Sequence, residues 1–356
     1  MRVAYTLEQC WHRVPGGTGS AAIALASAIV ARGDVELVGV AGRHSRPATP
    51  GFEPPVRCAG LPVASPWLYE TWTRLHWPLV ESVVHDVDVV HATTVIPAAT
   101  RRPLVVTVHD VAFLRHPDFF TARGNKVFRR SLRLVRERAS LVLCSSRATV
   151  DDCLGAGFPA AQLRHVPLGV AAVNVDEADI ARVRATHDLP DRFVLFVGTL
   201  EPRKNLERLI AAMEVLPEPL PLVVAGIHGW GDAPAPGTGD VRLVGWVPQA
   251  DLPALYAAST VFAYPSLLEG FGMPVLEAMA AGTAVVTSAG TSTEEVAGGA
   301  AVLVDPRDVE SIARGIAGAI ERRDELVAAG RQRAAAATWE RTASLVVEAY
   351  AEAART

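Results

Sequence analysis

A cationic pair in the second half of the chain has the spacing of an anion-binding loop. The run Phe193-Val-Leu-Phe-Val-Gly-Thr-Leu-Glu-Pro-Arg-Lys-Asn-Leu206 predicts a strand, a turn at Gly198 and a helix opened by Arg203 and Lys204. In a parallel sheet this loop lies at the carboxyl edge, where ligands bind, and a guanidinium fork beside a compact ammonium suits a diphosphate. The chain has only two lysines, Lys126 and Lys204, which hints that the ammonium matters. A solvated helix start is the alternative, although two cations at a helix N-terminus are unfavourable without an anion.

A glycine-rich turn with two acids lies further along the chain. In Pro265-Ser-Leu-Leu-Glu-Gly-Phe-Gly-Met-Pro-Val-Leu-Glu-Ala-Met-Ala-Ala-Gly282, two glycines and Pro274 separate Glu269 from Glu277, so these acids cannot share one continuous helix. Pro274 suits the first turn of a helix, which leaves Glu269 in the loop and Glu277 one turn into the helix. The backbone N–H groups of residues 270–273 then face a phosphate at a helix N-terminus, and glycine permits its close approach. One carboxylate for a ribose diol and one for a sugar hydroxyl fit a nucleotide-sugar pocket; two surface acids beside an ordinary turn are the alternative.

Two other loops carry weaker signals. The stretch Gly245–Tyr256 follows a predicted strand and opens a helix, which indicates only a loop at the sheet edge. In Gly16-Gly-Thr-Gly-Ser-Ala-Ala22, the spacing from Gly17 to Ala22 matches a dinucleotide fingerprint. However, eight residues separate the first strand from Gly16, too many for the tight turn of that fingerprint, and the second strand ends without a ribose-binding acid. A nicotinamide dehydrogenase is therefore disfavoured.

Two histidines end predicted strands in the first half. His109 ends Val105-Val-Thr-Val-His-Asp110, so its ring should reach the carboxyl edge of the sheet, where ligands bind and an imidazole can donate a hydrogen bond or relay a proton. Asp110 can orient this ring or line an acceptor pocket. His91 is the competing histidine. A structural role is the alternative for a strand-end histidine, and we favour His109 as the functional one.

One acidic pair resembles a metal motif. Asp86-Val-Asp88 has the D-x-D form, yet Asp88 leads directly into a buried strand, which favours plain strand entry. Helix amides together with Arg203 and Lys204 can neutralise a diphosphate without a divalent ion. We therefore predict a metal-independent site without a cofactor, in which a nucleotide sugar is a co-substrate.

Predicted strands and helices, which must position these residues, alternate along the whole chain. Short apolar runs between longer amphipathic patterns predict a parallel α/β architecture. A short first strand is predicted at Met1–Leu7. The other predicted strands, near-continuously apolar as expected for strands covered on both faces, include Val35–Val40, Val87–His91, Leu104–His109, Leu141–Ser145, Phe193–Val197, Leu222–Ala225, Val241–Val244, Val261–Tyr264 and Ala284–Thr287. The predicted helices include Ser20–Arg32, Leu206–Met213 and Asp308–Ile320. The charged stretch 170–192 is the best boundary, so we expect two doubly wound domains, 1–170 and 171–339, with a terminal helix at about 340–356 that could cross back to the first.

Composition narrows the class of protein. The net charge is −4, but residues through Val170 hold 19 basic and 13 acidic side chains, whereas the remainder holds 15 and 25. An anion bound by the acidic half must be held by local donors, which argues against nucleic acid as the main partner. No signal peptide or membrane span is apparent, and four scattered cysteines match neither a disulfide framework nor a metal site. We expect a reduced, cytoplasmic protein.

A basic segment, Arg123–Arg138, predicts an amphipathic helix. Its apolar face comprises Phe128, Leu132, Val135 and Ala139, and its arginines off that face are Arg129, Arg130, Arg133 and Arg136. A solvated basic face is the default; the alternative is contact with anionic lipid, at the inner membrane face, or with a phosphorylated acceptor. Nearby aromatic residues that either pack in the core or line an acceptor surface are Trp67, Tyr69, Trp72 and Trp77.

The order of these motifs resembles that of retaining glycosyltransferases of the family-4 type. These enzymes have the GT-B fold, two Rossmann-like domains that face each other across a cleft. The similarity runs from Phe193 to about Tyr350 and includes Val296-Ala-Gly-Gly-Ala-Ala-Val-Leu-Val-Asp-Pro306 and the late Trp339. It implies an N-terminal acceptor domain and a C-terminal donor domain.

The resemblance also implies roles for the residues of the second half. Arg203 and Lys204 would hold the donor diphosphate after the turn at Gly198, and Glu277 would hold the ribose. Glu269 and the backbone of Gly270, Phe271 and Gly272 would contact the sugar and phosphate. Val247 and its loop would border the base. Many relatives carry an arginine directly after the glycine that matches Gly198, where this chain has Thr199, so Arg203 would supply that charge.

In the first half, the resemblance assigns a glycine pair and a histidine. Gly16 and Gly17 match a loop that faces the donor phosphate, and His109 is similar to a cleft histidine that contacts the donor sugar. The implied catalytic set is thus His109 with Glu269, Lys204 and Arg203, while Asp110 lines the acceptor pocket.

The implied activity is transfer of a hexose from a nucleotide sugar to a hydroxyl group. The run Gly-Thr-Leu-Glu-Pro-Arg-Lys-Asn is most like that of bacterial mannosyltransferases, which weakly favours GDP-mannose and leaves UDP-sugars open. The acceptor is a saccharide, a lipid-linked sugar or a metabolite. The alternatives are a GT-B epimerase that acts on the nucleotide sugar itself and a non-catalytic subunit that only binds it.

Overall fold

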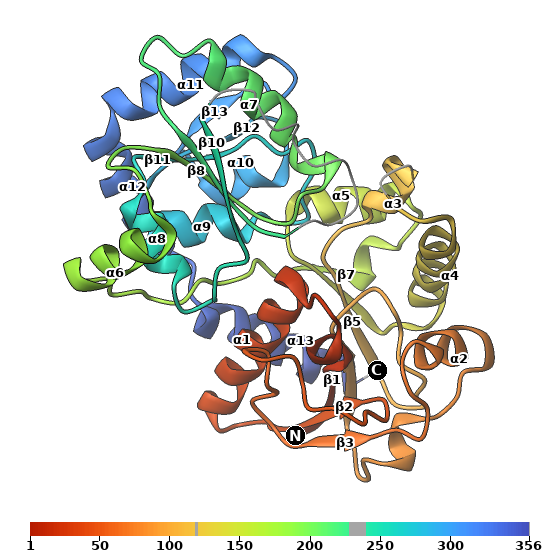
Figure 1. Ribbon diagram of the computed structural model, residues 1–356. Coiled ribbons are helices and arrows are strands. Elements are labelled where there is room, and N and C mark those ends of the chain that lie inside the picture. Colours follow the sequence, from red (N-terminus) through yellow and green to blue (C-terminus); the bar gives the residue numbers. More distant parts are fainter. Residues whose placement is uncertain (118–119, 228–239, 356) are drawn as a thin grey trace. The chain divides into compact units, whose positions relative to one another are not determined.

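The computed structural model describes residues 1–117, 120–227 and 240–355. The chain divides into two compact units, one formed by Met1–Gly169 with the C-terminal segment from Trp339, the other by Val170–Thr338 (Figure 1). Each unit is built on a parallel sheet covered by helices. The predicted α/β class with two Rossmann-like domains is confirmed.

The sheet of the first unit has seven strands in the order β3-β2-β1-β4-β5-β6-β7. They are β1 (Arg2–Thr6), β2 (Glu36–Ala41), β3 (Cys58–Gly60), β4 (Val89–Ala92), β5 (Leu104–Val108), β6 (Leu141–Cys144) and β7 (Leu163–His165). All neighbours pair in parallel, and the central strands β4 and β5 are wholly buried, which explains their continuous apolar sequence. The winding reverses between β1 and β4, where a parallel sheet leaves a crevice for ligands.

Helices cover both faces of this sheet. They are α1 (Gly16–Arg32), α2 (Trp67–Leu75), α3 (Ala112–Arg115), α4 (Ala122–Arg138), α5 (Arg147–Gly155) and α13 (Trp339–Ala353). Tyr5 of β1 donates a hydrogen bond to the Ala22 carbonyl of α1 at 2.9 Å, so this face of the sheet lies under α1. Its neighbour Ala4 points to the opposite face, where it joins a core cluster with Trp72 of α2 and Leu132 of α4.

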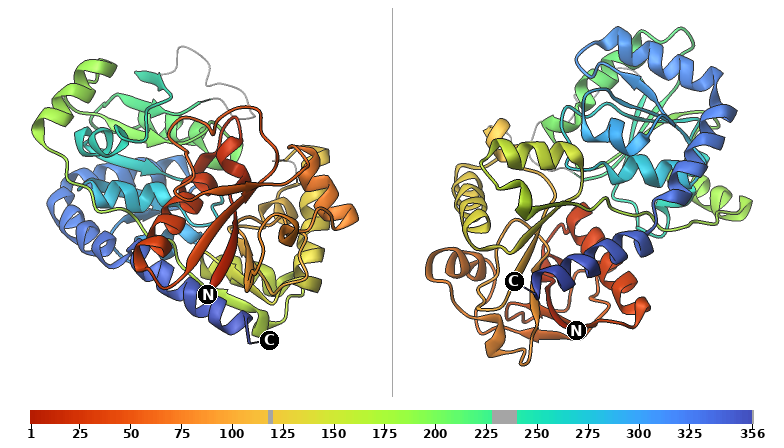
Figure 2. Two further views of the ribbon diagram at one scale, coloured as in Figure 1. Left: turned by 90° about the horizontal axis from the view of Figure 1, so that it is seen from below. Right: turned by 180° about the vertical axis from the view of Figure 1, so that it is seen from behind.

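The C-terminal helix α13 belongs to the first unit and packs beside α1 (Figure 2). The Tyr350 hydroxyl and His91 Nδ1 are 2.6 Å apart. Thr342 Oγ1 donates a hydrogen bond to the Pro167 carbonyl at 2.8 Å, and Arg164 pairs with a glutamate at the end of the helix. These contacts fix the last helix to strands formed early in the chain.

The sheet of the second unit has six strands in the order β10-β9-β8-β11-β12-β13. They are β8 (Val194–Val197), β9 (Leu222–Ala225), β10 (Val241–Gly245), β11 (Val261–Tyr264), β12 (Ala284–Ser288) and β13 (Val302–Val304). The helices are α6 (Glu177–His187), α7 (Leu206–Glu214), α8 (Leu252–Ala258), α9 (Met273–Ala280), α10 (Ser292–Ala297), α11 (Val309–Glu321) and α12 (Arg323–Ala336). The chain winds outward from β8 to β10 and then returns to β11 beside β8. The loops after β8 and β11 therefore leave the sheet at its switch point.

The elements differ from the predicted ones mainly at their ends. β5 and β6 each end one residue earlier than predicted. α1 begins at Gly16 instead of Ser20, so the glycine run forms the first helical turns and is not a loop before them. The basic pair lies in a 3₁₀ turn, η5 (Pro202–Lys204), ahead of α7, because Asn205 has a left-handed φ of 62° that separates the turn from the helix. Three strands that were not predicted, β3, β7 and β13, have three residues each, too few for a clear apolar pattern.

Candidate functional site

Two loops meet at the switch point of the second sheet. The loop after β8 carries Arg203 and Lys204, and the loop after β11 carries Glu269. The loops contact each other through their backbones, because the Leu267 N–H donates a hydrogen bond to the Arg203 carbonyl at 2.8 Å. The fold therefore brings together the cations and the acid that the sequence singled out.

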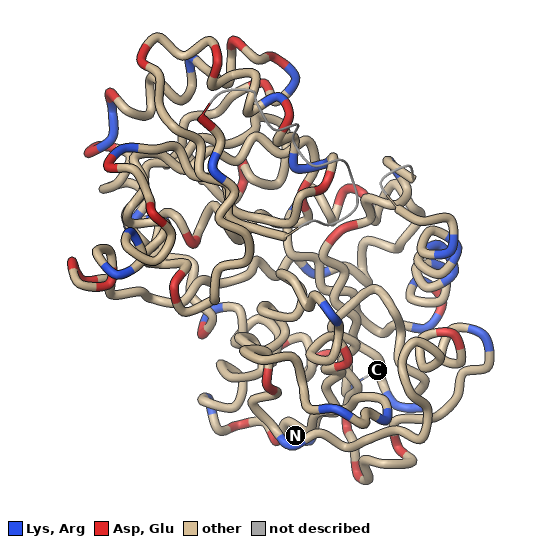
Figure 3. Tube along the Cα trace, in the orientation of Figure 1, with Lys and Arg blue, Asp and Glu red and all other residues tan. Residues whose placement is uncertain are grey.

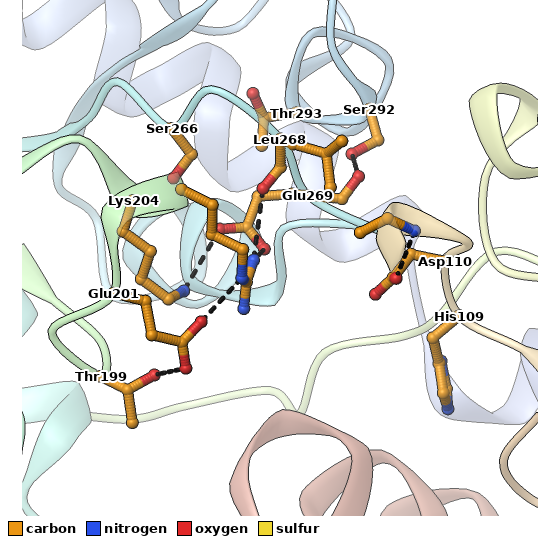
Figure 4. A network of polar contacts seen from close by, with 12 residues as sticks. His109, Asp110, Thr199, Glu201, Lys204, Ser266, Leu268, Glu269, Ser292 and Thr293 are labelled. Carbon is orange, nitrogen blue, oxygen red and sulfur yellow. Dashed lines mark hydrogen bonds and ion pairs between the residues drawn. The ribbon is translucent and has the colours of Figure 1, made fainter. Parts of the chain in front are cut away.

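The Glu269 carboxylate is the centre of this cluster (Figure 4). Its Oε2 accepts a hydrogen bond from Arg203 Nη1 at 2.7 Å, and its Oε1 accepts one from Lys204 Nζ at 3.2 Å. The Tyr264 hydroxyl donates a third to Oε1 at 2.8 Å and itself accepts from Lys204 Nζ. Both cations that were predicted to face a diphosphate thus already share one acid.

The cluster lies in a buried environment that strengthens its electrostatics. Burial alone would raise the pKa of Glu269, but the positive charges of Arg203 and Lys204 outweigh it and hold this pKa at about 2. Burial lowers the pKa of Lys204, and the Glu269 charge opposes that shift. Each group keeps the other ionised, so the site presents fixed charges to a ligand and needs little reorganisation.

Two members of the cluster were not predicted. Glu201 Oε2 accepts a hydrogen bond from Arg203 Nε at 2.7 Å, while its Oε1 accepts one from the Thr199 hydroxyl at 2.8 Å. Glu201 therefore orients the guanidinium that points at Glu269. Tyr264 is the last residue of β11, and a hydroxyl at the carboxyl end of a strand beside the switch point is a signal that could have identified it.

Gly198 shapes the path of the Lys204 side chain. Its φ of 152° lies in the region that favours glycine, and a Cβ atom built there would lie 3.0 Å from Lys204 Cδ and 3.2 Å from Nζ. Gly198 therefore permits the predicted turn and also the close approach of the Lys204 side chain. It leaves room for the ammonium to reach Glu269.

The glycine-rich turn ends at the N-terminus of α9, as its sequence predicted. Gly272 precedes the helix with φ of 101°, and a Cβ atom there would lie 2.6 Å from Thr293 Cγ2. Gly270 and Phe271 connect it to Glu269, whose carbonyl accepts a hydrogen bond from Ser292 Oγ at 2.7 Å. Pro274 lies in the first turn of α9. The turn is thus held close to the start of α10.

Glu277 and Val247 lie apart from the Glu269 contacts. Glu277 is on α9, where its Oε2 accepts a hydrogen bond from the Tyr256 hydroxyl at 3.0 Å. Burial raises the pKa of Glu277, although the hydrogen bond from Tyr256 and the charge of Lys204 oppose the shift. Val247 is buried in the loop between β10 and α8.

His109 follows β5 in the first unit and lines a cavity there. Its carbonyl accepts hydrogen bonds from Ser145 Oγ at 3.1 Å and Thr149 Oγ1 at 3.0 Å, which fix the backbone at the strand end. Burial lowers the pKa of His109, and the charge of Asp110 opposes the shift. Asp110 lines the same cavity, and its Oδ1 accepts a hydrogen bond from the Ala112 N–H at 2.9 Å.

His91, the competing histidine, is wholly buried. Its Nδ1 contacts the Tyr350 hydroxyl, and its Nε2 lies 2.8 Å from Thr107 Oγ1. Both ring nitrogens therefore have partners within the core, which fits a structural role. The acid of the D-x-D run is also structural, because Asp88 accepts a hydrogen bond from the Arg2 N–H at 2.7 Å immediately before β4.

Gly16 and Gly17 lie in the first turn of α1, and a Cβ atom on either would meet nothing within 4 Å. They belong to the first unit together with His109 and Asp110, whereas the Glu269 cluster belongs to the second. Among the described residues, no group of three or more His, Cys, Asp or Glu side chains is arranged to hold a metal ion.

The basic segment forms α4, where the trace in Figure 3 is coloured blue for Lys and Arg at several positions. Leu132 and Val135 are buried, as predicted. Arg130 differs from the prediction, because it is half-buried and donates hydrogen bonds to Glu70 and Thr73 of α2, each at 2.8 Å. In the described ranges, none of the helices has the length and apolar character that crossing a bilayer requires.

The four aromatic residues in and near α2 differ in burial and fall into three groups. Trp72 is buried, and its Nε1 donates a hydrogen bond to the Pro78 carbonyl at 3.0 Å, so it is a core residue. Trp67 and Trp77 are exposed. Tyr69 is half-buried and lines the cavity beside His109.

Comparisons with known proteins cover both units. Residues 178–336 match the family model of glycosyl transferases group 1, and residues 15–172 match that of glycosyltransferase family 4. O-antigen chain mannosyltransferase B of Escherichia coli is 33% identical over 264 residues, which cover 69% of each chain. A GDP-mannose-dependent α-(1-6)-phosphatidylinositol monomannoside mannosyltransferase of Mycolicibacterium smegmatis is 30% identical over 64% of this chain and 66% of its own. The crystal structure of Anabaena HepE in complex with UDP and glucose superposes with a TM-score of 0.74 at 21% identity, over 99% of this chain and 100% of HepE.

Proposed function

The chain belongs to the group 1, family 4 glycosyltransferases, and from this premise we propose that it moves a hexose from a nucleoside-diphosphate sugar to a hydroxyl acceptor with retention. In this proposal the second unit binds the donor and the first unit binds the acceptor. The observation that carries it is the cluster of Arg203, Lys204 and Glu269 at the switch point between β8 and β11.

The cluster suits a leaving diphosphate. Arg203 and Lys204 supply a fork and a point charge, and the N-terminus of α9 supplies backbone amides from Gly270 to Gly272. Before the donor arrives, Glu269 holds both cations in place and prevents them from repelling each other. When the donor is bound, the Glu269 carboxylate accepts a hydrogen bond from a sugar hydroxyl.

The reaction breaks the bond between the anomeric carbon and the diphosphate oxygen, and the electron pair stays on the diphosphate. The acceptor oxygen forms the new bond on the same face, and its proton passes to the departing phosphate. Stabilisation of the developing negative charge by Lys204, Arg203 and the helix amides is the largest catalytic effect in this scheme. In this scheme His109 contacts the donor sugar, and its ring is neutral because burial lowers its pKa. Asp110 lines the acceptor side.

The remaining donor contacts follow the family pattern. Glu277 holds the ribose, the Val247 loop borders the base, and Gly16 and Gly17 face the donor phosphate. GDP-mannose is the favoured donor, supported by the two mannosyltransferases that resemble this chain. A UDP-sugar is the alternative, supported by the UDP and glucose in the HepE complex.

A panel of nucleotide sugars tests the function. A true donor at 100 times its Kd stabilises the folded protein by about 2.7 kcal/mol, so GDP-mannose, UDP-glucose and UDP-N-acetylglucosamine are compared by thermal unfolding. Mass spectrometry then follows transfer to an acceptor mixture, and NMR assigns the anomeric configuration of the product. If no nucleotide sugar stabilises the protein, the proposal is wrong. A changed sugar on the nucleotide would favour the epimerase, and binding without turnover would favour the silent subunit.

We also propose that the face formed by α2 and α4 contacts an anionic membrane surface peripherally. Exposed Trp67 and Leu75 lie around one cavity with Arg123 and Lys126, and such a combination of apolar and cationic side chains suits a lipid headgroup layer. Sedimentation with phosphatidylglycerol vesicles should remove the protein from solution, whereas phosphatidylcholine vesicles should not. Trp67→Ala should weaken this binding, and Trp246→Ala, an equally exposed tryptophan of the second unit, should not. Equal binding to both lipids would contradict the proposal.

A further inference from the structure

A cavity of about 470 Å³ lies within the first unit, where His109 and Asp110 follow the strand β5. Its walls come from α2, α3 and α4 and from the loop after β4. A volume of this size lies in the range of roughly 300–1,000 Å³ that holds small molecules. The cavity therefore adjoins the residues that the proposed function places on the acceptor side.

Three phenylalanines form one wall of this cavity. The ring centroids of Phe113 and Phe128 lie 5.4 Å apart, those of Phe120 and Phe128 lie 6.0 Å apart, and those of Phe113 and Phe120 lie 6.3 Å apart. The rings meet at steep or tilted angles, so they pack against one another in a stable aromatic cluster. Ile96 and Val127 extend this apolar wall.

The charged residues that line the cavity are Glu70, Asp110 and Arg123, and Arg123 Nη2 lies 3.7 Å from Glu70 Oε1. Glu70 accepts hydrogen bonds from Arg74 at 2.9 Å and Arg130 at 2.8 Å, and these arginines keep the pKa of Glu70 below its usual value despite partial desolvation. Asp110 accepts from the backbone at the start of α3. The neutral groups that can recognise a hydroxyl include His109 and the pair of His12 and Tyr69, whose Nε2 and hydroxyl oxygen lie 3.1 Å apart. Three threonines also line the cavity, at Thr18, Thr94 and Thr121.

The apolar wall of the cavity fits poorly with a bare saccharide. Sugar hydroxyls placed against Phe113, Phe128 and Ile96 would lose hydrogen bonds to water without gaining partners, which costs free energy. An apolar group in the same position gains free energy in proportion to the area it buries.

We propose that this cavity receives an apolar group of the acceptor, either a hydrophobic ring or an alkyl chain, and holds the reacting hydroxyl beside His109. The inference rests on the proposed function, which it narrows to acceptors that carry a hydrophobic portion next to the hydroxyl. The apolar group can belong to a glycoside or to a small hydroxylated molecule. In both acceptors the cavity would contact an apolar group that lies next to the reacting hydroxyl.

Direct binding tests the inference without turnover. The full chain is titrated calorimetrically with methyl α-D-mannopyranoside and octyl α-D-mannopyranoside, which share one sugar, and with 4-butylphenol, which carries its own hydroxyl. Each methylene buried against the phenylalanine wall multiplies the affinity severalfold, so octyl mannoside should bind about tenfold or more tightly than methyl mannoside. Binding of octyl mannoside alone identifies a glycoside, and binding of 4-butylphenol identifies a small aglycone; either supports the inference.

Val127→Trp checks that the cavity is the site. Val127 is half-buried on α4 and lines the cavity, so an indole there should fill the space and reduce binding of the apolar probes tenfold or more. Val150→Trp on α5 is the matched control, since Val150 is also half-buried but lies outside the cavity lining. Equal affinity for the two mannosides with no binding of 4-butylphenol would overturn the inference. Binding that survives Val127→Trp would overturn it too.

A donor titration separates this inference from the proposed function. If a nucleotide sugar binds but the apolar probes do not, the acceptor class is wrong and the enzyme class stands. If the apolar probes bind and no nucleotide sugar does, the cavity is real and the proposed function fails.

Discussion

Replacing Glu269 by glutamine tests the electrostatics of the candidate site most fully. The pKa of this carboxyl is about 2 in the folded protein, against an ordinary value of 4.5. A difference of about 2.5 pKa units corresponds to roughly 3 kcal/mol of stability, at about 1.36 kcal/mol per unit. Glutamine keeps the shape of the side chain but removes the charge that Arg203 and Lys204 share. Glu269→Gln should therefore destabilise the second unit by about 3 kcal/mol at pH 7.

Thermal unfolding measures this loss. For a unit of this size, each kcal/mol shifts Tm by about 2–4 °C, so the second unit of Glu269→Gln should unfold roughly 6–12 °C below the wild type. The control is Glu207→Gln, an exposed glutamate on α7, which should change stability by no more than about 0.5 kcal/mol. Equal Tm values for the two variants would refute the reasoning, because Glu269 would then contribute no more than a surface acid.

The same variant has a distinct pH dependence and a distinct response to ligand. Because the folded-state pKa of Glu269 lies below the unfolded-state pKa, its stabilisation is present above about pH 4.5 and is lost as the pH falls toward 2. The gap in stability between wild type and Glu269→Gln should narrow over that window. A nucleoside diphosphate should also stabilise the variant more than the wild type, because the anion replaces the missing counter-charge of Lys204 and Arg203. A gap that stayed constant from pH 7 to pH 3 would contradict the assignment.

Two further substitutions test individual positions. Gly198→Ala should displace the Lys204 side chain, because the added methyl lies against it and the backbone has a φ that favours glycine. Steady-state kinetics should then show a raised KM for the donor. The control is Gly318→Ala, where nothing lies within 4 Å of the added methyl; equal KM values for the two variants would contradict this prediction. Tyr350→Phe should leave Nδ1 of His91 without its partner in the core, at a cost of about 1–3 kcal/mol in the free energy of unfolding by urea, and an unchanged value would show that the contact is dispensable.

Strand positions and cluster residues could be predicted because their causes are local in the sequence. Near-continuous apolar runs identified β5, β8 and β11, and the glycine-rich turn identified the start of α9. In a parallel sheet these strands must end at one edge, so the loops with Arg203, Lys204 and Glu269 could be placed together in advance. The short strands at the sheet edges lacked this pattern and were missed.

What the sequence could not supply was the pairing between charges. The notion of a free cationic pair overlooked Glu269 and Glu201, which bind Arg203 within the loop cluster. Such contacts depend on side-chain rotamers and on the close packing that Gly198 allows. Neither can be recognised from a pattern in the sequence. Arg130 is a similar case, because its pairing with Glu70 arises from the packing of α4 against α2.

The most direct test of the account is whether Lys204 binds the nucleoside diphosphate. GDP and UDP are titrated calorimetrically into the wild type, into Lys204→Ala and into Lys126→Ala, which removes the only other lysine of the chain. A charge-assisted hydrogen bond contributes about 1.5–3 kcal/mol, so Lys204→Ala should weaken binding of the preferred nucleotide about 10- to 100-fold while circular dichroism shows an intact fold, and Lys126→Ala should bind as the wild type does. Unchanged affinity in a folded Lys204→Ala protein would mean that the loops after β8 and β11 do not hold the donor.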